Sequence, residues 1–245
     1  MNGTAGSPKM SEMGRVIGVF ISPVKTFQDI ARKPTWVVPL LLLIVSGLVA
    51  SAAYLPHMDW EKSAVKQADM IRDKWGVKLT DQQIDQQIES AKRTGPIKQY
   101  GGAFLGPLLI TLIPALIYFA VIRLGRGMVA YAAAYSVVCF ASLPGVIRTL
   151  LTAMAATRGD SLIDTDLAAL VPSNFLFFLD RDQITFSQVT LGQATDLFEI
   201  WSLILTILGL SAVSTWSRGR CAAVVLIPWV VFYGGVTLLL SSLGM

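Results

Sequence analysis

Arg148 and Glu199 are the residues of this sequence whose types and positions are best suited to chemistry, because each interrupts a long apolar run. A charge at the centre of a bilayer costs about 2.5 to 3.5 kcal/mol on insertion scales, so such a residue marks an ion pair, a pathway or a binding site. Asp196 lies about one helical turn before Glu199. A long arginine side chain can reach a carboxylate on a neighbouring helix. We therefore predict an intramembrane polar pair between Arg148 and either Glu199 or Asp196.

Two interpretations of this polar pair follow. In the functional interpretation, Arg148 and Glu199 line a site or a path for a proton or another substrate. In the structural interpretation, the arginine forms an ion pair between helices or extends to the lipid head groups. The apolar runs contain no second acid or histidine that would continue a relay, which favours the structural interpretation.

No catalytic or cofactor motif accompanies the pair. The sequence has no P-loop, dinucleotide fingerprint, zincin motif or nucleophile elbow. The single histidine, His57, has no second metal ligand at useful spacing, and neither Cys139 nor Cys221 has a histidine nearby. The net charge of +4 comes without a basic cluster interleaved with aromatic residues. We expect no enzyme activity, no metal, no cofactor and no nucleic-acid partner.

The elements that hold these residues have the composition of a membrane protein. Hydrophobic residues make up 53% of the 245 residues and charged residues 15%, and the mean hydropathy is +0.59. A soluble domain carries about 25% charged residues. Crossing the hydrocarbon core takes about 20 apolar residues. The sequence therefore predicts an all-α integral membrane protein with five transmembrane helices, at about 37–55, 103–122, 129–156, 197–215 and 221–243.

We expect residues 1–13 to be a disordered tail and residues 14–245 to form one membrane domain, with a polar helical loop over 56–102. The stretch from Ala50 to Ala52 mimics a signal-peptidase site. The apolar run before it is about 19 residues long, beyond the usual 7 to 15 of a signal peptide, so we expect a retained span.

Prolines and small residues are expected to shape the bundle. Prolines within spans remove a backbone hydrogen bond and predict kinks. Pairs of small residues four apart allow helices to approach closely. The prolines are Pro39, Pro107, Pro114, Pro144 and Pro228, and the small-residue pairs are Gly47 with Ser51 and Gly102 with Gly106.

Three segments outside the spans carry helical patterns. Ser22-Pro23 starts a short amphipathic helix, with its apolar stripe either on the inner leaflet or against the bundle. In the loop over 56–102, one helix ends at Gly76, and a second begins with a capping box at Thr80 and Gln83 and ends at Gly95-Pro96. We expect these two helices to form a hairpin that packs either on the bundle or on a partner, and the bundle is favoured because isolated helices this short are marginal in water. Residues 167–179 are too short to span, and we expect an interfacial anchor or a re-entrant segment.

Lysine and arginine residues define the predicted orientation. Three groups of them placed in the cytoplasm put the N-terminus inside and the C-terminus outside. The loop over 56–102 is discordant because it holds eight further Lys and Arg residues. The three groups are Lys9, Arg15, Lys25, Arg32 and Lys33; Arg123 and Arg126; and Arg218 and Arg220.

Three stretches together resemble bacterial members of the Yip (Ypt-interacting protein) domain family. They are Phe20 to Pro39, which includes Pro23; Ala134 to Pro144, which includes Tyr135 and Ser136; and Asp196 to Leu203, which includes Trp201. The resemblance covers about Gly14 to Val236 and implies five spans with a cytoplasmic N-terminus in a bacterial inner membrane.

Eukaryotic relatives in that family are membrane adaptors in vesicle traffic that engage prenylated Rab-type GTPases. This sequence has a short segment before its first span, and Asp196-Leu197-Phe198 lacks the Tyr-Gly-Pro sequel of those relatives. The resemblance therefore does not carry GTPase binding over. Our leading hypothesis is a non-enzymatic scaffold or adaptor that contacts the bilayer and either a protein partner or further copies of itself. The alternative is a small transporter or permease with a polar path near Arg148 and Glu199.

Overall fold

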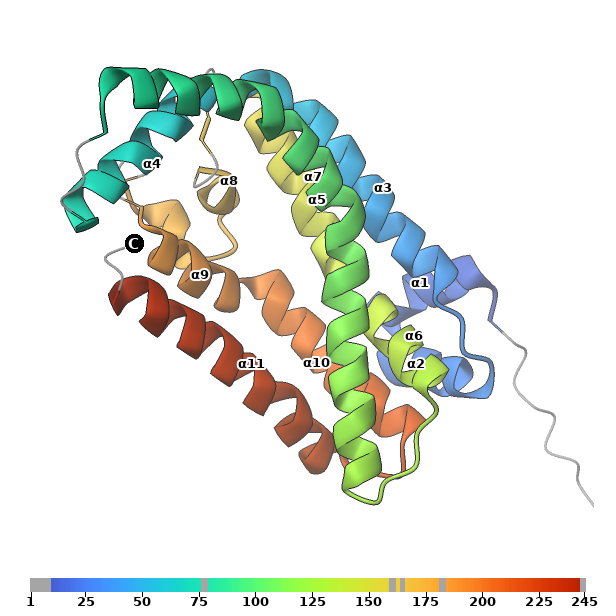
Figure 1. The fold of residues 1–245 in the computed structure, drawn as a ribbon. Coiled ribbons are helices and arrows are strands. Elements are labelled where there is room, and N and C mark those ends of the chain that lie inside the picture. Colours follow the sequence, from blue (N-terminus) through green and yellow to red (C-terminus); the bar gives the residue numbers. More distant parts are fainter. Residues whose placement is uncertain (1–9, 76–78, 159–161, 164–165, 181–183, 243–245) are drawn as a thin grey trace, which may run out of the picture.

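The computed structural model is built from helices (Figure 1). It describes residues 10–75, 79–158, 162–163, 166–180 and 184–242, and these contain no strand. The helices, in chain order, are α1 (Glu12–Ile21), α2 (Pro23–Arg32), α3 (Val37–Tyr54), η1 (Leu55–His57), α4 (Trp60–Trp75), α5 (Asp81–Leu124), α6 (Tyr131–Ala141), α7 (Leu143–Ala156), α8 (Asp166–Ala169), η2 (Phe175–Phe178), α9 (Phe186–Ala194), α10 (Leu197–Val213) and α11 (Arg218–Ser242).

Within the described residues, four helical segments are long and apolar enough to cross a membrane, and a bent pair makes a fifth. The four are Val37–His57, Asp81–Leu124, Tyr131–Ala156 and Arg218–Ser242. The bent pair is α9 with α10, which meet at 45°. The 17 residues of α10 measure about 25 Å, slightly less than the hydrocarbon thickness. The all-helical membrane fold predicted from the sequence is confirmed, with four or five candidate spans.

The long helix α5 differs from the prediction. It runs for 44 residues without a break, and Pro96, Pro107 and Pro114 lie inside it. The prediction that Gly95-Pro96 ends a helix is therefore wrong. The hydrogen bond that a proline removes is one of many in such a helix, and the ring of Trp60 packs directly over Gly95 at this point. Figure 1 shows α5 running along the top of the molecule and then turning down through the bundle.

The predicted hairpin in the polar loop is present, formed by α4 and the first part of α5. The capping box at Thr80 and Gln83 is confirmed. The ammonium of Lys92 lies 3.0 Å from the carboxylate of Glu61 and joins the two helices. The hairpin is also tied to the chain beyond the third span, because Asp59 N–H donates to the Leu162 carbonyl at 2.8 Å. The hairpin is therefore attached to its own chain at its base, where Asp59 precedes α4.

The short helix α6 is the centre of the core. Every residue from Ala133 to Ala141 is buried. The predicted span is present and is interrupted at Ser142, beside Pro144, which lies in the first turn of α7, where a proline costs no intrahelical hydrogen bond. Pro39 lies in the first turn of α3. Pro39 therefore does not kink α3, which corrects that part of the prediction.

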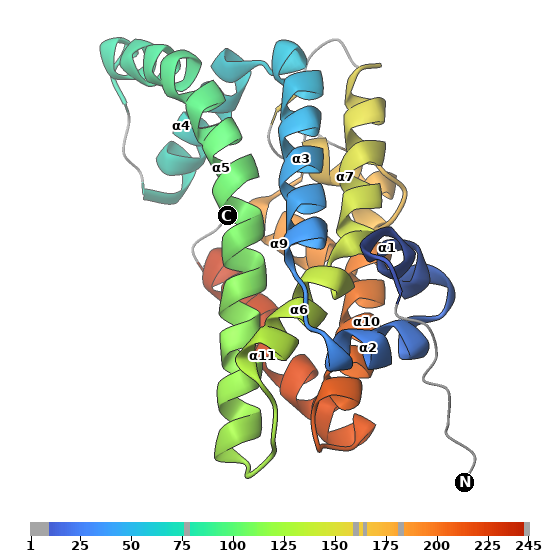
Figure 2. The ribbon, with the colours of Figure 1, turned by 90° about the vertical axis from the view of Figure 1, so that its right-hand side faces the viewer.

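The N-terminal helices belong to the bundle. Phe27 and Ile30 of α2 are fully buried, so the apolar stripe of α2 contacts protein, one of its two predicted locations. The ring of Phe27 packs over Gly209 of α10. Helix α1 was not predicted at all, and it begins at Glu12, so residues 12 and 13 of the expected tail are helical. Residues 1–9 of that tail lie outside the described part of the chain. Figure 2 shows α1 and α2 side by side against the lower half of the bundle.

Of the two predicted small-residue contacts, one forms. A Cβ placed on Gly47 of α3 would lie 3.2 Å from the carbonyl oxygen of Ala103 in α5. Pro107 leaves this carbonyl without its usual helical donor, so the close approach of α3 covers it. A Cβ placed on Gly102 or on Gly106 would meet nothing within 4 Å, so this second pair mediates no helix contact within the described chain.

Candidate functional site

The predicted polar pair joins Arg148 to Asp196. Arg148 lies on α7, and its Nε is 2.8 Å from Oδ2 of Asp196, the residue that precedes α10. The side chain of Asp196 is 2% exposed, whereas that of Arg148 is 25% exposed. Of the two carboxylates considered from the sequence, Asp196 is the one that pairs with the arginine.

Asp196 makes more contacts than an ion pair requires. Its Oδ2 also accepts hydrogen bonds from Ser173 Oγ at 2.5 Å and from Asn174 Nδ2 at 3.1 Å. Its Oδ1 accepts from the Phe198 N–H at 2.9 Å and so caps α10. A buried carboxylate is stable only when its charge and lone pairs are satisfied. Asp196 therefore fixes the bend between α9 and α10 and joins it to α7.

Sequence reasoning did not single out Ser173 and Asn174, which position Asp196 from the preceding segment. Asn174 donates to the Ala168 carbonyl at 3.1 Å and accepts from the Leu176 N–H at 3.0 Å. Leu176 is fully buried and packs over Gly192 of α9. The stretch over 167–179, expected to be an anchor or a re-entrant segment, thus folds back onto α9. Asn174 followed by a short apolar run is a local signal for such a turn.

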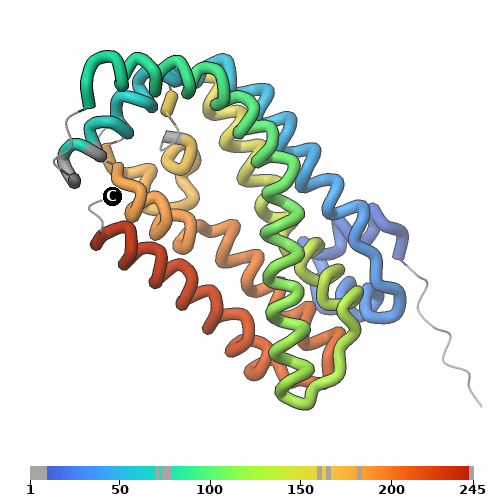
Figure 3. Tube along the Cα trace, in the orientation of Figure 1, coloured from blue at the N-terminus to red at the C-terminus, as the bar shows by residue number. Residues whose placement is uncertain are grey.

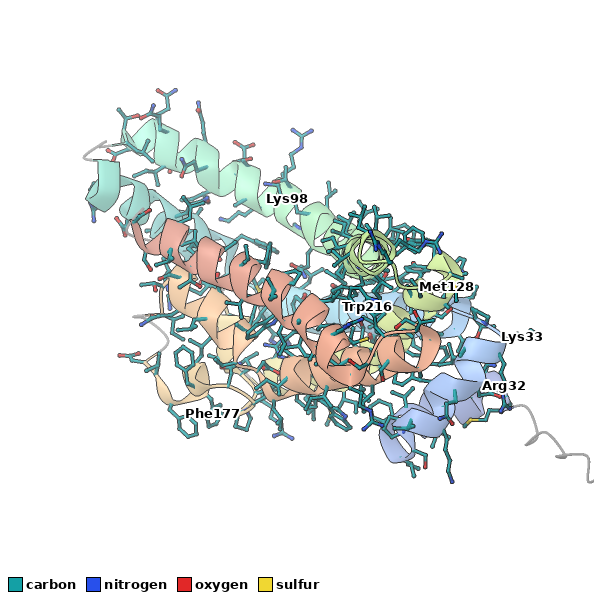
Figure 4. The ribbon with its side chains drawn as sticks, turned by 90° about the horizontal axis from the view of Figure 1, so that it is seen from below. Arg32, Lys33, Lys98, Met128, Phe177 and Trp216 are labelled. Atoms are coloured by element: carbon teal, nitrogen blue, oxygen red, sulfur yellow. The ribbon has the colours of Figure 1, made fainter. Side chains whose placement is uncertain are left out.

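The aromatic residues of this segment divide between core and surface. Phe178 is 80% exposed and Phe177 42% exposed, and their rings pack edge to face. Figure 4 shows Phe177 on the outer surface, at the opposite end of the view from Lys33. Exposed aromatic rings at the end of a membrane bundle are typical of an interfacial anchor.

Glu199 lies in the first turn of α10 but forms no salt bridge with Arg148 within the described residues. The groups around it come from two other helices: Tyr118 of α5, and Trp229 and Tyr233 of α11. The indole N–H of Trp229 is buried without a hydrogen bond of good geometry to any described group. Glu199 and Asp196 thus have different neighbours, although Glu199 also feels the charges of Asp196 and Arg148.

The six residues that carried the family resemblance serve packing. Pro23 starts α2, and Pro39 and Pro144 lie in the first turns of α3 and α7. Tyr135 lies between Trp36 and Tyr131, with ring centroids 5.4 and 6.0 Å away. These contacts form the seam between the N-terminal helices and the bundle centre. The remaining two positions are Ser136, whose hydroxyl donates to Ala132, and Trp201, whose ring packs on Phe20.

The structure contains a second buried ion pair, between Arg15 and Asp29, which was not predicted from the sequence. Their side chains are 3% and 8% exposed, and the shortest N···O distance is 2.8 Å. Arg15 also donates to the Lys33 carbonyl at 3.0 Å and to Thr35 Oγ1 at 2.6 Å. This one guanidinium therefore joins α1, α2 and the connection to α3. The signal in the sequence is an arginine within the apolar run of α1.

No group of three or more histidine, cysteine or carboxylate residues capable of holding a metal occurs in the part of the chain that the structure describes. The two free cysteines, Cys139 and Cys221, are both buried. The side chains brought together in the described part of the chain are two ion pairs, Arg148 with Asp196 and Arg15 with Asp29, and the carboxylate of Glu199.

Comparison with known proteins identifies the family of this membrane bundle. The family described as the Yip1 domain matches residues 17–239. The chain belongs to this family. A curated relative, membrane protein YknW of Bacillus subtilis (strain 168), is 23% identical over 237 residues, which cover 95% of this chain and 93% of the relative. No solved structure matches. The Yip1 domain thus accounts for the membrane bundle and leaves its specific role open.

Proposed function

We propose that this Yip1-domain protein is a non-enzymatic scaffold or adaptor in a bacterial inner membrane, with its N-terminus in the cytoplasm and its C-terminus outside. The observation that carries the proposal is the use of Asp196 as a structural junction. Arg148, Ser173, Asn174 and the N–H of Phe198 all bind its carboxylate, so this group is engaged in holding segments of the chain together. A pair used in this way holds helices together.

The location of the cavities supports the same conclusion. One cavity of about 190 Å³ lies beside the hairpin and is lined by residues that include Trp60, Lys98 and Phe186. A second of about 470 Å³ lies at the other end of the bundle. Neither is lined by Arg148 or Glu199. A transporter needs a path from one side to the polar centre, whereas a scaffold needs only surfaces.

The hairpin of α4 and α5 is the surface we assign to partner binding. It projects beyond the bundle, as Figure 2 shows. Val65 on α4 is 39% exposed and Ile97 on α5 is 70% exposed, although both lie in the polar loop segment. Exposed apolar side chains on a polar amphipathic hairpin are suited to contact another protein.

The test is photo-crosslinking in native membranes with a photoreactive residue at Val65. We expect a crosslinked product of defined mass, either with a second copy or with a partner, that survives stringent purification. The matched control is Val45, which is 52% exposed on the membrane helix α3 and should contact lipid alone. If Val65 gives only the background found at Val45, the hairpin binds no partner and the adaptor role loses its support.

Transport is the second candidate, and the surroundings of Glu199 are what favour it. Among the described residues this carboxylate has no salt-bridge partner, and it lies near Tyr118, Tyr233 and the indole N–H of Trp229. A carboxylate within a membrane helix can bind a proton or a cation. The discriminating variant is Glu199→Gln, because glutamine keeps the shape and removes the charge. Loss of a proton or solute flux in reconstituted vesicles, with unchanged thermal stability and unchanged Val65 crosslinking, would establish transport in place of the adaptor role.

A further inference from the structure

Two turns at the basic end of the molecule form one rigid unit. The α5–α6 turn covers residues 125–130, and the α10–α11 turn covers residues 214–217. The Met128 N–H donates to Thr215 Oγ1 at 3.0 Å, and the Thr215 N–H donates to the Met128 carbonyl at 3.2 Å. The ring of Trp216 covers Gly125 and Gly127 so closely that a Cβ on either would lie within 2.5 Å of it.

These turns border an open depression of the surface, of about 470 Å³. Arg123 and the chain from Met128 to Ala130 line one side of it, and residues 212–215 line the other. Figure 4 shows Met128 and Trp216 at the end of the molecule that also carries Arg32 and Lys33. We call this depression the basic groove.

The charge around the basic groove is of one sign. Arg123, Arg126, Arg218 and Arg220 are exposed and form no ion pair within the described residues. The sequence has no Asp or Glu between Glu89 and Asp160, and none after Glu199. On the neighbouring helices, Glu12 and Asp29 are occupied by Arg15. The four guanidinium groups therefore lack a counter-charge from the described part of this chain.

Arg126 is held in an unfavourable backbone conformation. Its φ is +62°, the one positive value found for a non-glycine residue in the described chain. Glycine adopts this conformation at no cost, whereas other residues lose about 1 to 2 kcal/mol. The chain has glycine at 125 and at 127, yet arginine occupies the strained position between them. Strain of this kind is retained where a side chain serves a purpose.

Apolar side chains border the arginines. Leu124 is 85% exposed and Met128 is 65% exposed. The groove lies where the membrane helices α5, α10 and α11 begin or end, which is the depth of the lipid phosphates. A ligand that satisfies both features has an anionic phosphate and hydrocarbon chains, whereas an acidic protein segment would leave the apolar border exposed.

We propose that the basic groove is a binding site for an anionic phospholipid, with its phosphate at Arg123 and Arg126 and its acyl chains along Leu124 and Met128. Arginine binds phosphate through two parallel N–H donors, which makes it well suited to this ligand. Basic pockets between membrane helices recognise anionic head groups in this way. The site does not depend on the adaptor role proposed above.

The experiment measures lipid binding to the delipidated full-length protein in mild detergent by native mass spectrometry. The probes are short-chain phosphatidylglycerol, short-chain phosphatidylcholine and glycerol phosphate. We expect phosphatidylglycerol to bind at least tenfold more tightly than either other probe. Equal binding of phosphatidylcholine would overturn the anionic specificity, and equal binding of glycerol phosphate would show a site for free phosphate instead of lipid. A polyglutamate peptide that displaces the lipid at lower concentration than phosphatidylglycerol itself would assign the groove to a protein.

Matched variants test whether these arginines bind lipid specifically or only contribute the positive charge that orients the protein in the membrane. Arg123→Gln should weaken phosphatidylglycerol binding about tenfold, as expected for a lost charged hydrogen bond. Arg126→Gly removes the second cation without backbone strain and should weaken binding while leaving the melting temperature unchanged or higher. The control Arg93→Gln removes the same charge from the exposed hairpin and should leave binding unchanged. Equal effects of Arg123→Gln and Arg93→Gln would show dependence on net charge alone and would overturn the proposal.

Discussion

Arg15 and Arg148 are arginines in apolar surroundings that each contact a nearly buried aspartate, Asp29 and Asp196. Removing one member of a buried ion pair leaves an uncompensated charge, which costs more than the pair itself contributes. Both pairs also bind backbone or hydroxyl groups from other segments. At the scale of single residues, these aspartates and arginines therefore hold together segments whose contact is not indicated by the hydrophobic pattern of the sequence.

Arg148→Leu should destabilise the protein by about 3 kcal/mol, because Asp196 would keep its charge without a cation. The measurement is thermal unfolding in detergent together with abundance in the membrane. The double variant with Asp196→Asn should recover part of the loss, since it removes the stranded charge. Arg158→Leu, at an exposed position just beyond the end of the same helix, is the control and should be neutral. Full stability of Arg148→Leu would rule out the structural role.

Arg15→Met should release the N-terminal helices while the membrane bundle stays folded. Removing one partner of a buried ion pair costs about 3 to 5 kcal/mol of stability. Hydrogen exchange should rise across α1 and α2 and stay unchanged in α7. The exposed neighbour Lys25→Met should leave both unchanged. If α1 in Arg15→Met keeps its protection against hydrogen exchange, Arg15 does not hold the N-terminal helices together.

At the scale of elements, close packing decides where helices continue and where they break. α5 continues through Pro96, where the ring of Trp60 from α4 packs on Gly95. The segment from Tyr131 to Ala156 is instead divided at Ser142, with the fully buried α6 on one side. Small residues mark the crossings: α2 meets α10 at Gly209, and α3 meets α5 at Gly47.

Gly209→Ala should separate α10 from α6 and α2. A Cβ at this position would lie 2.4 Å from Val137 Cγ1 and 3.0 Å from the ring of Phe27, so the fully buried core must shift. We expect destabilisation of about 1 to 3 kcal/mol. The control Gly235→Ala meets nothing within 4 Å in α11 and should stabilise its helix by roughly 0.5 to 1 kcal/mol. Thermal unfolding of both variants measures the difference, and equal melting temperatures would contradict this packing.

At the scale of the whole molecule, charge is segregated between the two ends. The end with the α5–α6 and α10–α11 turns carries cations without exposed neighbouring acids in the described chain, whereas the hairpin end carries both signs. Figure 3 follows the chain between these ends along α3, α5 and α11. Because cations favour the cytoplasmic side, the arginines of these two turns are the part of this pattern on which the proposed orientation rests, whereas the eight Lys and Arg residues of the loop over 56–102 oppose it.

Single-cysteine labelling should place Ser217 on one side of the membrane and Ser90 and Ser242 on the other. Both α5 and α11 run from end to end as continuous helices, so the residues at their two ends face opposite solvents. The background variant replaces the two native cysteines, Cys139 and Cys221, with alanine, because both are buried. An impermeant thiol reagent applied to intact cells should label Ser90→Cys and Ser242→Cys alone. Labelling of Ser217→Cys under the same conditions would reverse the orientation.

The sequence by itself determined that the protein folds in a lipid bilayer and which segments form its membrane helices. Apolar runs long enough for a bilayer predicted the membrane helices, and the capping box at Thr80 predicted the start of α5, because hydrophobic length and local hydrogen bonds are properties of neighbouring residues. It also named Asp196 and Glu199 as the two carboxylates that Arg148 could reach.

Only the tertiary structure decided which carboxylate pairs with Arg148. It also decided at which residues the helices continue or end. The choice of Asp196 over Glu199 depends on Ser173 and Asn174, which arrive from a segment more than twenty residues away. The continuation of α5 past Pro96, the burial of Arg15 and the pinning of Met128 to Thr215 also depend on contacts between distant segments. Local propensity contains no term for such contacts, and their energies exceed the cost of a single missing backbone hydrogen bond.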